Sequence, residues 1–375
     1  MTKYEALIPA LHKIIRESLA RQEYHFPTEA ALCREFSLSR VTVRKALQTL
    51  EDEGLIRRQQ GSGSFLTGLS PDPADNVVAL LLTAPLLYRS PTIVEQTRRV
   101  IQEAGFFLAV YDMKDSFQTE RCILTELIKH PPRGLLLECF SSTPDPNADL
   151  LQQLVAPPLR VPVVTLLAPF SASGMHATPA GALSSCLEAS SPAISFVAEE
   201  FLSGARLLVN TMSRLGHRRI AGIFPACSQP DALRLQSLLT SFCEADLPID
   251  PWQFFLPGNI ETAEILQGNS SLLDHFMEHI AGTCTALVCS NDLLAVAASR
   301  RAAAHGLRIP LDLALASMEE SYVQDLSSPR ISSLSGLSCL GECAARLLIQ
   351  KIRGAAPESL LLPLTLTNGT SLCRI

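Results

Sequence analysis

The sequence lacks the features that define several large classes of protein. No apolar run approaches the roughly 18–20 residues that a membrane-spanning helix needs, and the N-terminus is a polar amphipathic segment rather than a signal peptide. The 11 cysteines are odd in number, include no CxxC pair and have no histidines at zinc spacing, which favours reduced, buried thiols. We therefore expect a cytoplasmic protein with no metal centre and no membrane association.

Residue patterns for catalysis are also missing. The sequence contains no HExxH, P-loop or Ser-His-Asp pattern. Lysine, which a pyridoxal-phosphate enzyme needs for its Schiff base, occurs after residue 69 only at Lys114, Lys129 and Lys351, on polar helix faces or helix ends. We expect neither an enzyme nor a bound cofactor.

Charge is sparse and unevenly distributed. Charged residues make up 18% of the chain and apolar residues 47%, a globular rather than a disordered composition, and the length of 375 residues predicts two or three domains. Residues 1–69 carry 10 Lys and Arg against 8 Asp and Glu, net +2, whereas the remainder carries 21 against 29, net −8. This division fits one part that touches phosphates and another that is kept away from nucleic acid.

The stretch from residue 26 to residue 66 predicts two short helices and a hairpin. Thr28 is a suitable N-cap for the first helix and Ser39 for the second. The second helix continues to about residue 53, and its apolar face, spaced i, i+3, i+4, i+7, consists of Val43, Ala46, Leu47 and Leu50. A basic segment with a Gly-Ser-Gly turn follows and predicts a hairpin. Two helices joined by a tight turn and followed by a hairpin form a winged helix-turn-helix, which binds DNA.

In such a motif the second helix enters the major groove with its N-terminal residues facing the bases. The arginines in this segment suit guanine or phosphate, and the hydroxyl groups suit either base edges or phosphates. For any single arginine, a solvated position on an ordinary amphipathic helix is the alternative. The predicted contacts with double-stranded DNA are Thr28, Ser39, Arg40, Thr42, Val43, Arg44, Arg57, Arg58, Gly61 and Gly63.

Residues 4–67 resemble the DNA-binding domain of the GntR family of bacterial transcription regulators. The resemblance is carried by FPTE at 26–29, LSR at 38–40, TVR at 42–44, AL at 46–47, and the wing residues Gly61, Gly63 and Phe65. Ala30 and Ser62 stand where many members have a basic residue. The resemblance implies a DNA-binding regulator. One winged helix spans too few base pairs for genomic specificity, so we expect a homodimer on a two-fold symmetric operator.

After residues 68–76, a linker rich in Pro, Gly and Asp, apolar strands alternate with helices. The predicted strands are 77–82, 106–111, 134–137, 162–165, 219–224, 287–289 and 313–316, and the predicted helices are 92–104, 117–129, 204–215, 232–244, 293–305 and 341–352. Residues 168–192 are rich in Ser, Ala, Gly and Pro and predict an irregular insertion. The alternation predicts an α/β fold in two successive halves, with a ligand at the carboxyl ends of the strands between them.

Three segments in the second half resemble the LacI/GalR regulators and the periplasmic sugar-binding proteins. They are LGHRRIAGI at 215–223, the segment from CSNDLLAV to LALAS at 289–317, and PRISSL at 329–334 with the helix that follows. The resemblance implies a winged helix domain over residues 1–67 and a two-lobed, periplasmic-binding-protein-like effector domain over residues 77–375. GntR-type heads joined to LacI-type sensors are a known arrangement among sugar-utilisation repressors.

The family's effector contacts match a few positions of this chain. Its helix arginine and the Asp of its Asn-Asp motif correspond to Arg234 and Asp292, a pair that can clamp hydroxyl groups. A surface position is the alternative for Arg234, and a helix N-cap is the alternative for Asp292. The loop after the first strand and the segment at 317–320 complete the predicted effector contacts, which are Tyr88, Arg89, Ser90, Arg234, Asp292 and Glu319.

Together these patterns predict a DNA-binding transcriptional regulator of the repressor type, controlled by a small-molecule effector, by resemblance a sugar. Two segments depart from the sensor family, at 237–238 and at 317–320, where Ser-Leu replaces Gly-Phe and Ser-Met-Glu-Glu replaces Gly-Phe-Asp-Asp. An alternative therefore stays open: a ligand-independent regulator whose degenerate sensor domain serves only for dimerisation. A thermal shift caused by a small molecule distinguishes the two.

Overall fold

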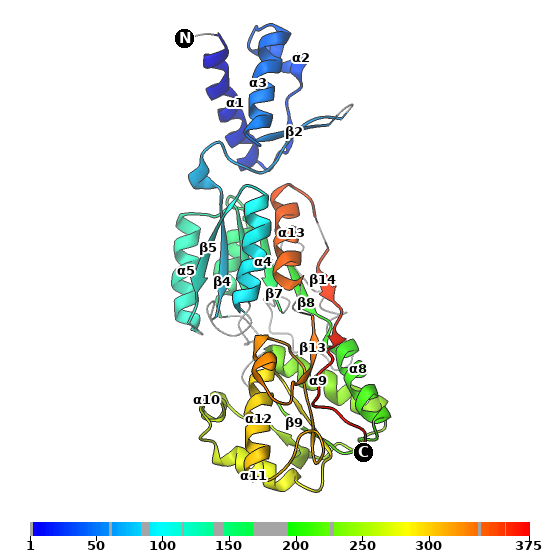
Figure 1. Ribbon diagram of the computed structural model, residues 1–375. Coiled ribbons are helices and arrows are strands. Elements are labelled where there is room, and N and C mark those ends of the chain that lie inside the picture. Colours follow the sequence, from blue (N-terminus) through cyan, green and yellow to red (C-terminus); the bar gives the residue numbers. More distant parts are fainter. Residues whose placement is uncertain are drawn as a thin grey trace.

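Three sheets organise the protein. The computed structural model describes residues 3–59, 62–83, 90–114, 116–138, 146–167, 194–225, 229–336, 339–356 and 358–375. These residues form one three-stranded and two six-stranded sheets. Figure 1 shows a head, an N-lobe and a C-lobe in a row, each built around one of these sheets. The mixed α/β architecture with an N-terminal winged helix is the predicted fold class.

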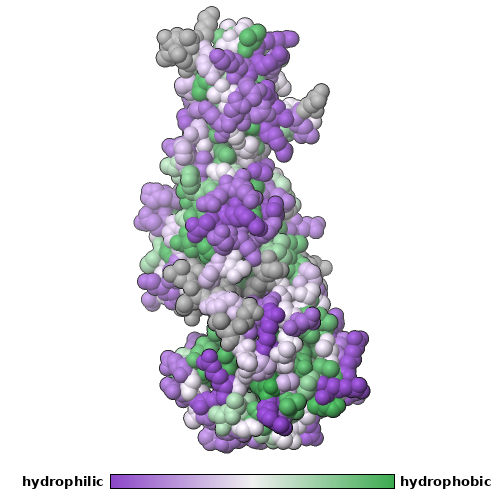
Figure 2. Space-filling model, in the orientation of Figure 1, coloured by the Kyte–Doolittle hydropathy of each residue, from purple (hydrophilic) through white to green (hydrophobic). Residues whose placement is uncertain are grey.

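The head contains the expected helices and hairpin. Its elements are α1 (Lys3–Ala20), β1 (His25–Phe26), α2 (Glu29–Glu35), α3 (Arg40–Asp52), β2 (Ile56–Gln59) and β3 (Gly63–Leu66). The strands lie in the antiparallel order β1-β3-β2. Apolar faces of the three helices meet in one core around Leu11, Leu32 and Leu50, which fixes α3 with its opposite face outward. On the view in Figure 2, hydrophilic side chains cover most of the head.

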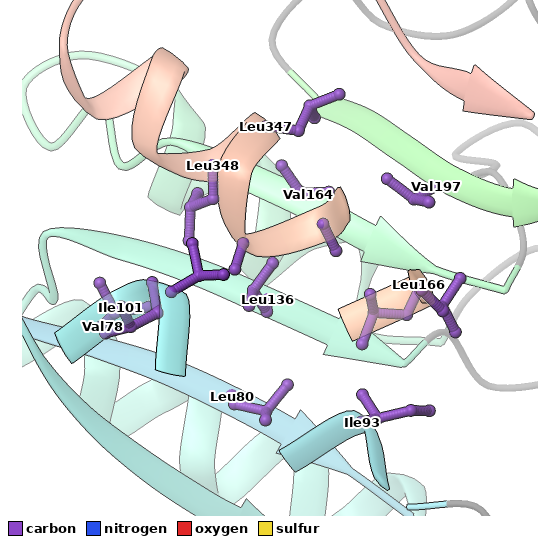
Figure 3. Close-up of a cluster of buried hydrophobic side chains, with 14 of the residues drawn as sticks. Val78, Leu80, Ile93, Ile101, Leu136, Val164, Leu166, Val197, Leu347 and Leu348 are labelled. Carbon is purple, nitrogen blue, oxygen red and sulfur yellow. The ribbon is translucent and has the colours of Figure 1, made fainter. Parts of the chain in front are cut away.

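The N-lobe is a fully parallel sheet in the order β14-β8-β7-β6-β4-β5. Its apolar strands are buried on both faces, as parallel sheets require. Helices α4 and α13 cover one face, where their leucines and isoleucines pack on the strands (Figure 3). Its elements are η1 (Pro73–Asp75), β4 (Val77–Leu82), α4 (Ser90–Glu103), β5 (Phe107–Asp112), α5 (Phe117–Lys129), β6 (Gly134–Glu138), α6 (Ala148–Val155), β7 (Val163–Leu166), β8 (Ile194–Glu199), α13 (Leu340–Ile352) and β14 (Leu360–Leu362).

The C-lobe sheet has the order β10-β9-β11-β12-β13-β15 and is parallel except at β15. Helices α8 and α9 pack on one face, and α11 and α12 pack on the other. Its elements are α8 (Phe201–Arg214), β9 (Ile220–Ile223), α9 (Gln229–Glu244), η2 (Pro251–Gln253), β10 (Phe254–Phe255), α10 (Asn259–Gln267), α11 (Ser271–Ile280), β11 (Ala286–Cys289), α12 (Asp292–Ala304), β12 (Ala314–Ser317), η3 (Tyr322–Leu326), β13 (Ser332–Ser335) and β15 (Thr365–Leu366).

The chain passes between the lobes three times, after β8, after β13 and after β14. The passages are packed against one another. A Cβ atom on Gly336 would lie 2.5 Å from Cδ2 of Leu364 and 3.4 Å from Oε1 of Glu199. One residue from each passage therefore lies at a single junction between the lobes. These residues are Glu199 at the carboxyl end of β8, Gly336 after β13 and Leu364 after β14.

Candidate DNA-binding and effector sites

The N-terminus of α3 presents its polar residues as predicted by the winged helix pattern. Ser39 caps the helix, since its hydroxyl accepts a hydrogen bond from the backbone N–H of Thr42 at 3.3 Å, and the two hydroxyls lie 2.9 Å apart. Arg40 is exposed at the first helical position. Thr28 caps α2 in the same way, through the N–H of Ala31 at 3.2 Å.

Val43 differs from the prediction. Its side chain is 0% exposed and belongs to the head core, so it does not reach a DNA surface. The i, i+3, i+4, i+7 spacing that makes α3 amphipathic forces Val43 inward together with Leu47 and Leu50. Val41 is instead 80% exposed on the outer face, beside Arg40. Its branched apolar side chain suits a thymine methyl group. Val41 lies outside the apolar stripe of α3 in the sequence, and this position could have identified it as an exposed residue that can contact DNA.

Two predicted arginines are already engaged within the head. Arg44 donates to both carboxylate oxygens of Glu29, with Nε at 3.3 Å and a terminal nitrogen at 3.1 Å. Arg58 contacts Glu51 and Gln48, and its hydrogen bond holds the pKa of Glu51 below its usual range. Exposed pairs of this kind contribute at most about 1 kcal/mol, so a phosphate or a guanine can compete for either guanidinium.

The remaining wing residues occupy different places. Gly63 has a φ of 105°, a left-handed conformation that favours glycine at the start of β3, whereas Gly61 lies outside the described residues. Arg57 is exposed near the N-lobe, where the pKa of Arg353 is lowered first by burial and then by the charge of Arg57. Arg57 thus lies toward the base of the wing.

Arg234 lies in a buried cluster of carboxylates at the junction of the lobes. One of its terminal nitrogens lies 2.5 Å from Oε2 of Glu319 and 3.7 Å from Oε2 of Glu199, and the other lies 3.5 Å from Oδ1 of Asp231. Its guanidinium carbon also stands 5.1 Å from the centre of the Phe201 ring, a cation–π distance. We call Glu199, Asp231, Arg234 and Glu319 the Arg234 cluster; it draws on both lobes, since Glu199 ends β8 of the N-lobe.

Asp292 occupies the same edge of the C-lobe sheet with a different partner. It begins α12 directly after the N-cap Asn291 and is 0% exposed. Its Oδ2 accepts hydrogen bonds from the backbone N–H and the hydroxyl of Ser321, at 2.7 and 2.8 Å. The hydroxyl of Ser290, two residues earlier, donates to Asp231 of the Arg234 cluster. The carboxyl ends of β9, β11 and β12 thus bring Arg234, Asp292 and Glu319 to one sheet edge.

The other effector predictions are less informative. Ser90 is buried at the first residue of α4, and Tyr88 and Arg89 lie outside the described residues. Glu199 and Asp231 were not predicted. β8 follows the Ser- and Ala-rich stretch at 168–192, which was predicted to be an irregular insertion and lies outside the described residues. Asp231 could have been found by its spacing of three residues from Arg234 on α9. In the described ranges no group of three or more His, Cys, Asp or Glu side chains is arranged so that it could hold a metal ion, and no helix there combines the length and apolarity needed to cross a membrane.

Comparisons with known proteins match both parts of the chain. Residues 3–66 match the model for bacterial regulatory proteins of the gntR family, and residues 209–372 match that of the periplasmic binding protein-like domain. The arabinose metabolism transcriptional repressor of Geobacillus stearothermophilus is 27% identical over 94% of this chain and 92% of its own length. Its namesake in Halalkalibacterium halodurans is 23% identical over 94% and 89%.

Solved structures share the fold. A periplasmic binding protein/LacI transcriptional regulator from Alkaliphilus metalliredigens, complexed with D-xylulofuranose, aligns with a TM-score of 0.61 and 16% identity over 79% of this chain and 98% of its own. The transcriptional regulator CelR in complex with cellobiose aligns with a TM-score of 0.62 and 21% identity over 89% and 91%. The matched families and relatives are regulators rather than enzymes. The chain therefore combines a gntR-family winged helix domain at its N-terminus with a periplasmic binding protein-like domain, and the two relatives that span nearly all of it are transcriptional repressors.

Proposed function

We propose that the protein is a transcriptional repressor, acting in the cytoplasm as a homodimer on a two-fold symmetric operator and controlled by a sugar bound between its lobes. The observation that carries this proposal is the contact between Arg234 of the C-lobe and Glu199 of the N-lobe, 3.7 Å apart where the carboxyl ends of both sheets meet. A ligand that binds such a position touches both lobes and therefore alters their relative arrangement.

The chemistry of the Arg234 cluster fits a neutral polyol. A guanidinium supplies donors in a planar fork, and carboxylates accept hydrogen bonds from hydroxyl groups. Arg234 and Glu319 are only 3% and 2% exposed, so a ligand has to replace part of their mutual contact. The sugar shifts the equilibrium between the two lobe arrangements by the difference in its affinity for them. The relative position of the two DNA-binding heads changes with the lobe arrangement.

The names of the relatives and structural neighbours indicate which sugars to test first. Two full-length relatives are named arabinose metabolism repressors, and two structural neighbours hold D-xylulofuranose and cellobiose. We propose a pentose as the effector class. Isothermal titration of the full chain with L-arabinose, D-xylulose and cellobiose tests this. Asp292→Asn should weaken the binding of the accepted sugar by about tenfold or more, because a charged acceptor is lost, while the exposed Asp312→Asn serves as the matched control.

The contact between Arg234 and Glu319 also favours the second candidate, a ligand-independent regulator, because the arginine already has a charged partner. The two are separated by the same titration. If no sugar binds, and operator affinity is unaffected by any of them, the sensor domain serves assembly alone. If a sugar binds and Asp292→Asn leaves its affinity intact, the effector site lies elsewhere.

A further inference from the structure

The head and the N-lobe meet around a pocket of about 390 Å³. Its walls come from the end of α1, Tyr24, the linker, and the loops that precede β6 and β7. The strands β6 and β7 begin beside this pocket and end at the opposite edge of the sheet, the edge that faces the C-lobe. The pocket is therefore separate from the Arg234 cluster, and its volume is within the range of small-molecule sites.

Positive charge dominates the lining. Arg16 of the head and Arg133 and Arg160 of the N-lobe face one carboxylate, that of Asp75. In the part of the chain that the structure describes, none of the three guanidinium groups forms an ion pair with a carboxylate. Three cations and one carboxylate around one cavity leave an excess of positive charge, which attracts an anion.

Arg133 is the most buried of the three. One of its terminal nitrogens donates to the carbonyl of Gly68 at 2.7 Å, while its Nε is buried without a hydrogen-bond partner. Burial lowers the pKa of Arg133, and the neighbouring Tyr24 and Asp75 offset this only in part. A guanidinium whose Nε is buried without a hydrogen-bond partner, and whose charge Asp75 offsets only in part, is unfavourable, so an anion in the pocket would stabilise it.

The pocket is held in shape by both of its sides. Prolines at 131, 132, 158 and 162 restrict the two N-lobe loops. The side-chain amide of Gln22 donates to the carbonyl of Arg160 at 3.0 Å, across the boundary between head and N-lobe. Gly354, after α13, lies so close to Tyr24 that a Cβ there would stand 2.3 Å from Cδ2 of its ring. A ligand therefore enters a largely preformed site.

We propose that this junction pocket binds a small anionic metabolite bearing a phosphate group, held by Arg16, Arg133 and Arg160. Guanidinium groups match phosphate oxygens in planar, bidentate geometry. Leu19 and Ile352 line the remaining space and accept the uncharged portion of the molecule. Arg16 belongs to the head and the other two arginines to the N-lobe, so a bound anion favours the arrangement in which the head packs on the N-lobe. Because this arrangement sets the position of the head, anion binding and operator binding are reciprocally linked.

The test is isothermal titration of the full chain with ribose 5-phosphate and with inorganic phosphate at constant ionic strength, with ribose as the uncharged control. The pocket variant is Arg16→Gln/Arg160→Gln, which changes two exposed side chains. Its matched control is Arg98→Gln/Arg218→Gln, which removes two exposed arginines away from the pocket. If the double pocket variant does not melt cooperatively, the single variant Arg160→Gln takes its place.

We expect saturable binding of ribose 5-phosphate, weakened about tenfold or more in the pocket variant and unchanged in the control, because charge-assisted hydrogen bonds are lost. Asp292→Asn should leave this binding intact, which separates it from the proposed sugar site. Absence of saturable binding of both anions by the wild type overturns the proposal, and so does equal affinity in the pocket variant. If operator affinity is the same with and without ribose 5-phosphate, the proposed linkage is overturned.

Discussion

Arg234 and Glu319 form an ion pair of 2.5 Å that is almost completely removed from solvent, with side chains 3% and 2% exposed. Replacing Arg234 by Met leaves Glu319 and the nearby Glu199 as buried negative charges without their cation. We expect Arg234→Met to lower the free energy of unfolding by about 3–5 kcal/mol, measured by urea denaturation of the full chain.

The matched double variant tests the cause. Arg234→Met/Glu319→Met removes both charges, so it should recover part of the lost stability. Arg308→Met, which breaks the exposed pair with Asp312, should leave the urea midpoint nearly unchanged. An Arg234→Met protein that unfolds at the wild-type urea concentration would show that this pair does not stabilise the junction.

Val41 and Val43 are two residues apart on α3 and should behave oppositely. Val43 is 0% and Val41 80% exposed. Val43→Ala creates a cavity in the head core and should cost about 1–3 kcal/mol of stability. Val41→Ala should change stability by less than about 0.5 kcal/mol, yet weaken binding to an operator selected from random DNA. Equal melting temperatures for the two variants would contradict the burial pattern.

The exposed arginines of α3 should contribute to DNA affinity. Arg44→Ala should weaken operator binding by about 1–3 kcal/mol if its guanidinium contacts a guanine, measured by fluorescence anisotropy at fixed salt. Glu29→Ala releases Arg44 from its pair and should instead leave affinity equal or raised. Arg21→Ala, a charge change at the end of α1, is the control. Unchanged binding in both Arg40→Ala and Arg44→Ala would exclude α3 as the reading helix.

Much of the head could be predicted from sequence because its signals are local. Caps such as Ser39 and the apolar stripe of α3 act within one helix, so their spacing is visible in the chain. β8, with the sequence ISFVAE, was missed because it is buried along its whole length yet contains Ser195 and Glu199, so it shows neither the continuous apolar run of β4 nor a clean alternation. α10 was missed because its apolar side chains do not form one stripe, since Ile260 is 74% and Leu266 46% exposed.

The candidate effector site was only partly predictable for a different reason. The motif identified Arg234 and Asp292 separately, whereas their partners depend on how the lobes meet. Glu199 reaches Arg234 from another sheet, and Ser321 reaches Asp292 across 29 residues of sequence. The hydrophobic periodicity of a single segment cannot predict contacts between segments that are distant in the sequence.

The exposed apolar side chains of α10 bear on assembly. Ile260 and Leu266 give the C-lobe an apolar surface that a second copy of the chain could cover. We expect a dimer by sedimentation velocity at micromolar concentration. Ile260→Asp should shift the protein toward monomer, whereas Leu311→Asp, at another position of similar exposure, should not. A wild-type monomer bound to a single half-site would contradict the proposed two-fold recognition.

His217 should make stability depend on pH. Its imidazole is 0% exposed and hydrogen-bonds the hydroxyl of Thr285 and the carbonyl of Cys373, each at 3.0 Å. Burial lowers its pKa below the ordinary value of 6.5, although the bond to Cys373 opposes this. The unfolded chain therefore binds a proton more readily than the folded one. The contribution of His217 is complete above pH 6.5 and declines as the pH falls below it, by at most about 1.4 kcal/mol per pH unit.

His217→Gln isolates this effect, because glutamine retains a donor and an acceptor but does not titrate. Urea denaturation at pH 5.5 and pH 7.5 should show a larger loss of stability at the acidic pH for the wild type than for His217→Gln. His130→Gln, which changes an exposed histidine, should behave like the wild type. If His217→Gln loses as much stability between the two pH values as the wild type does, the imidazole is not held neutral by its burial, and His217 is not the source of the acid sensitivity.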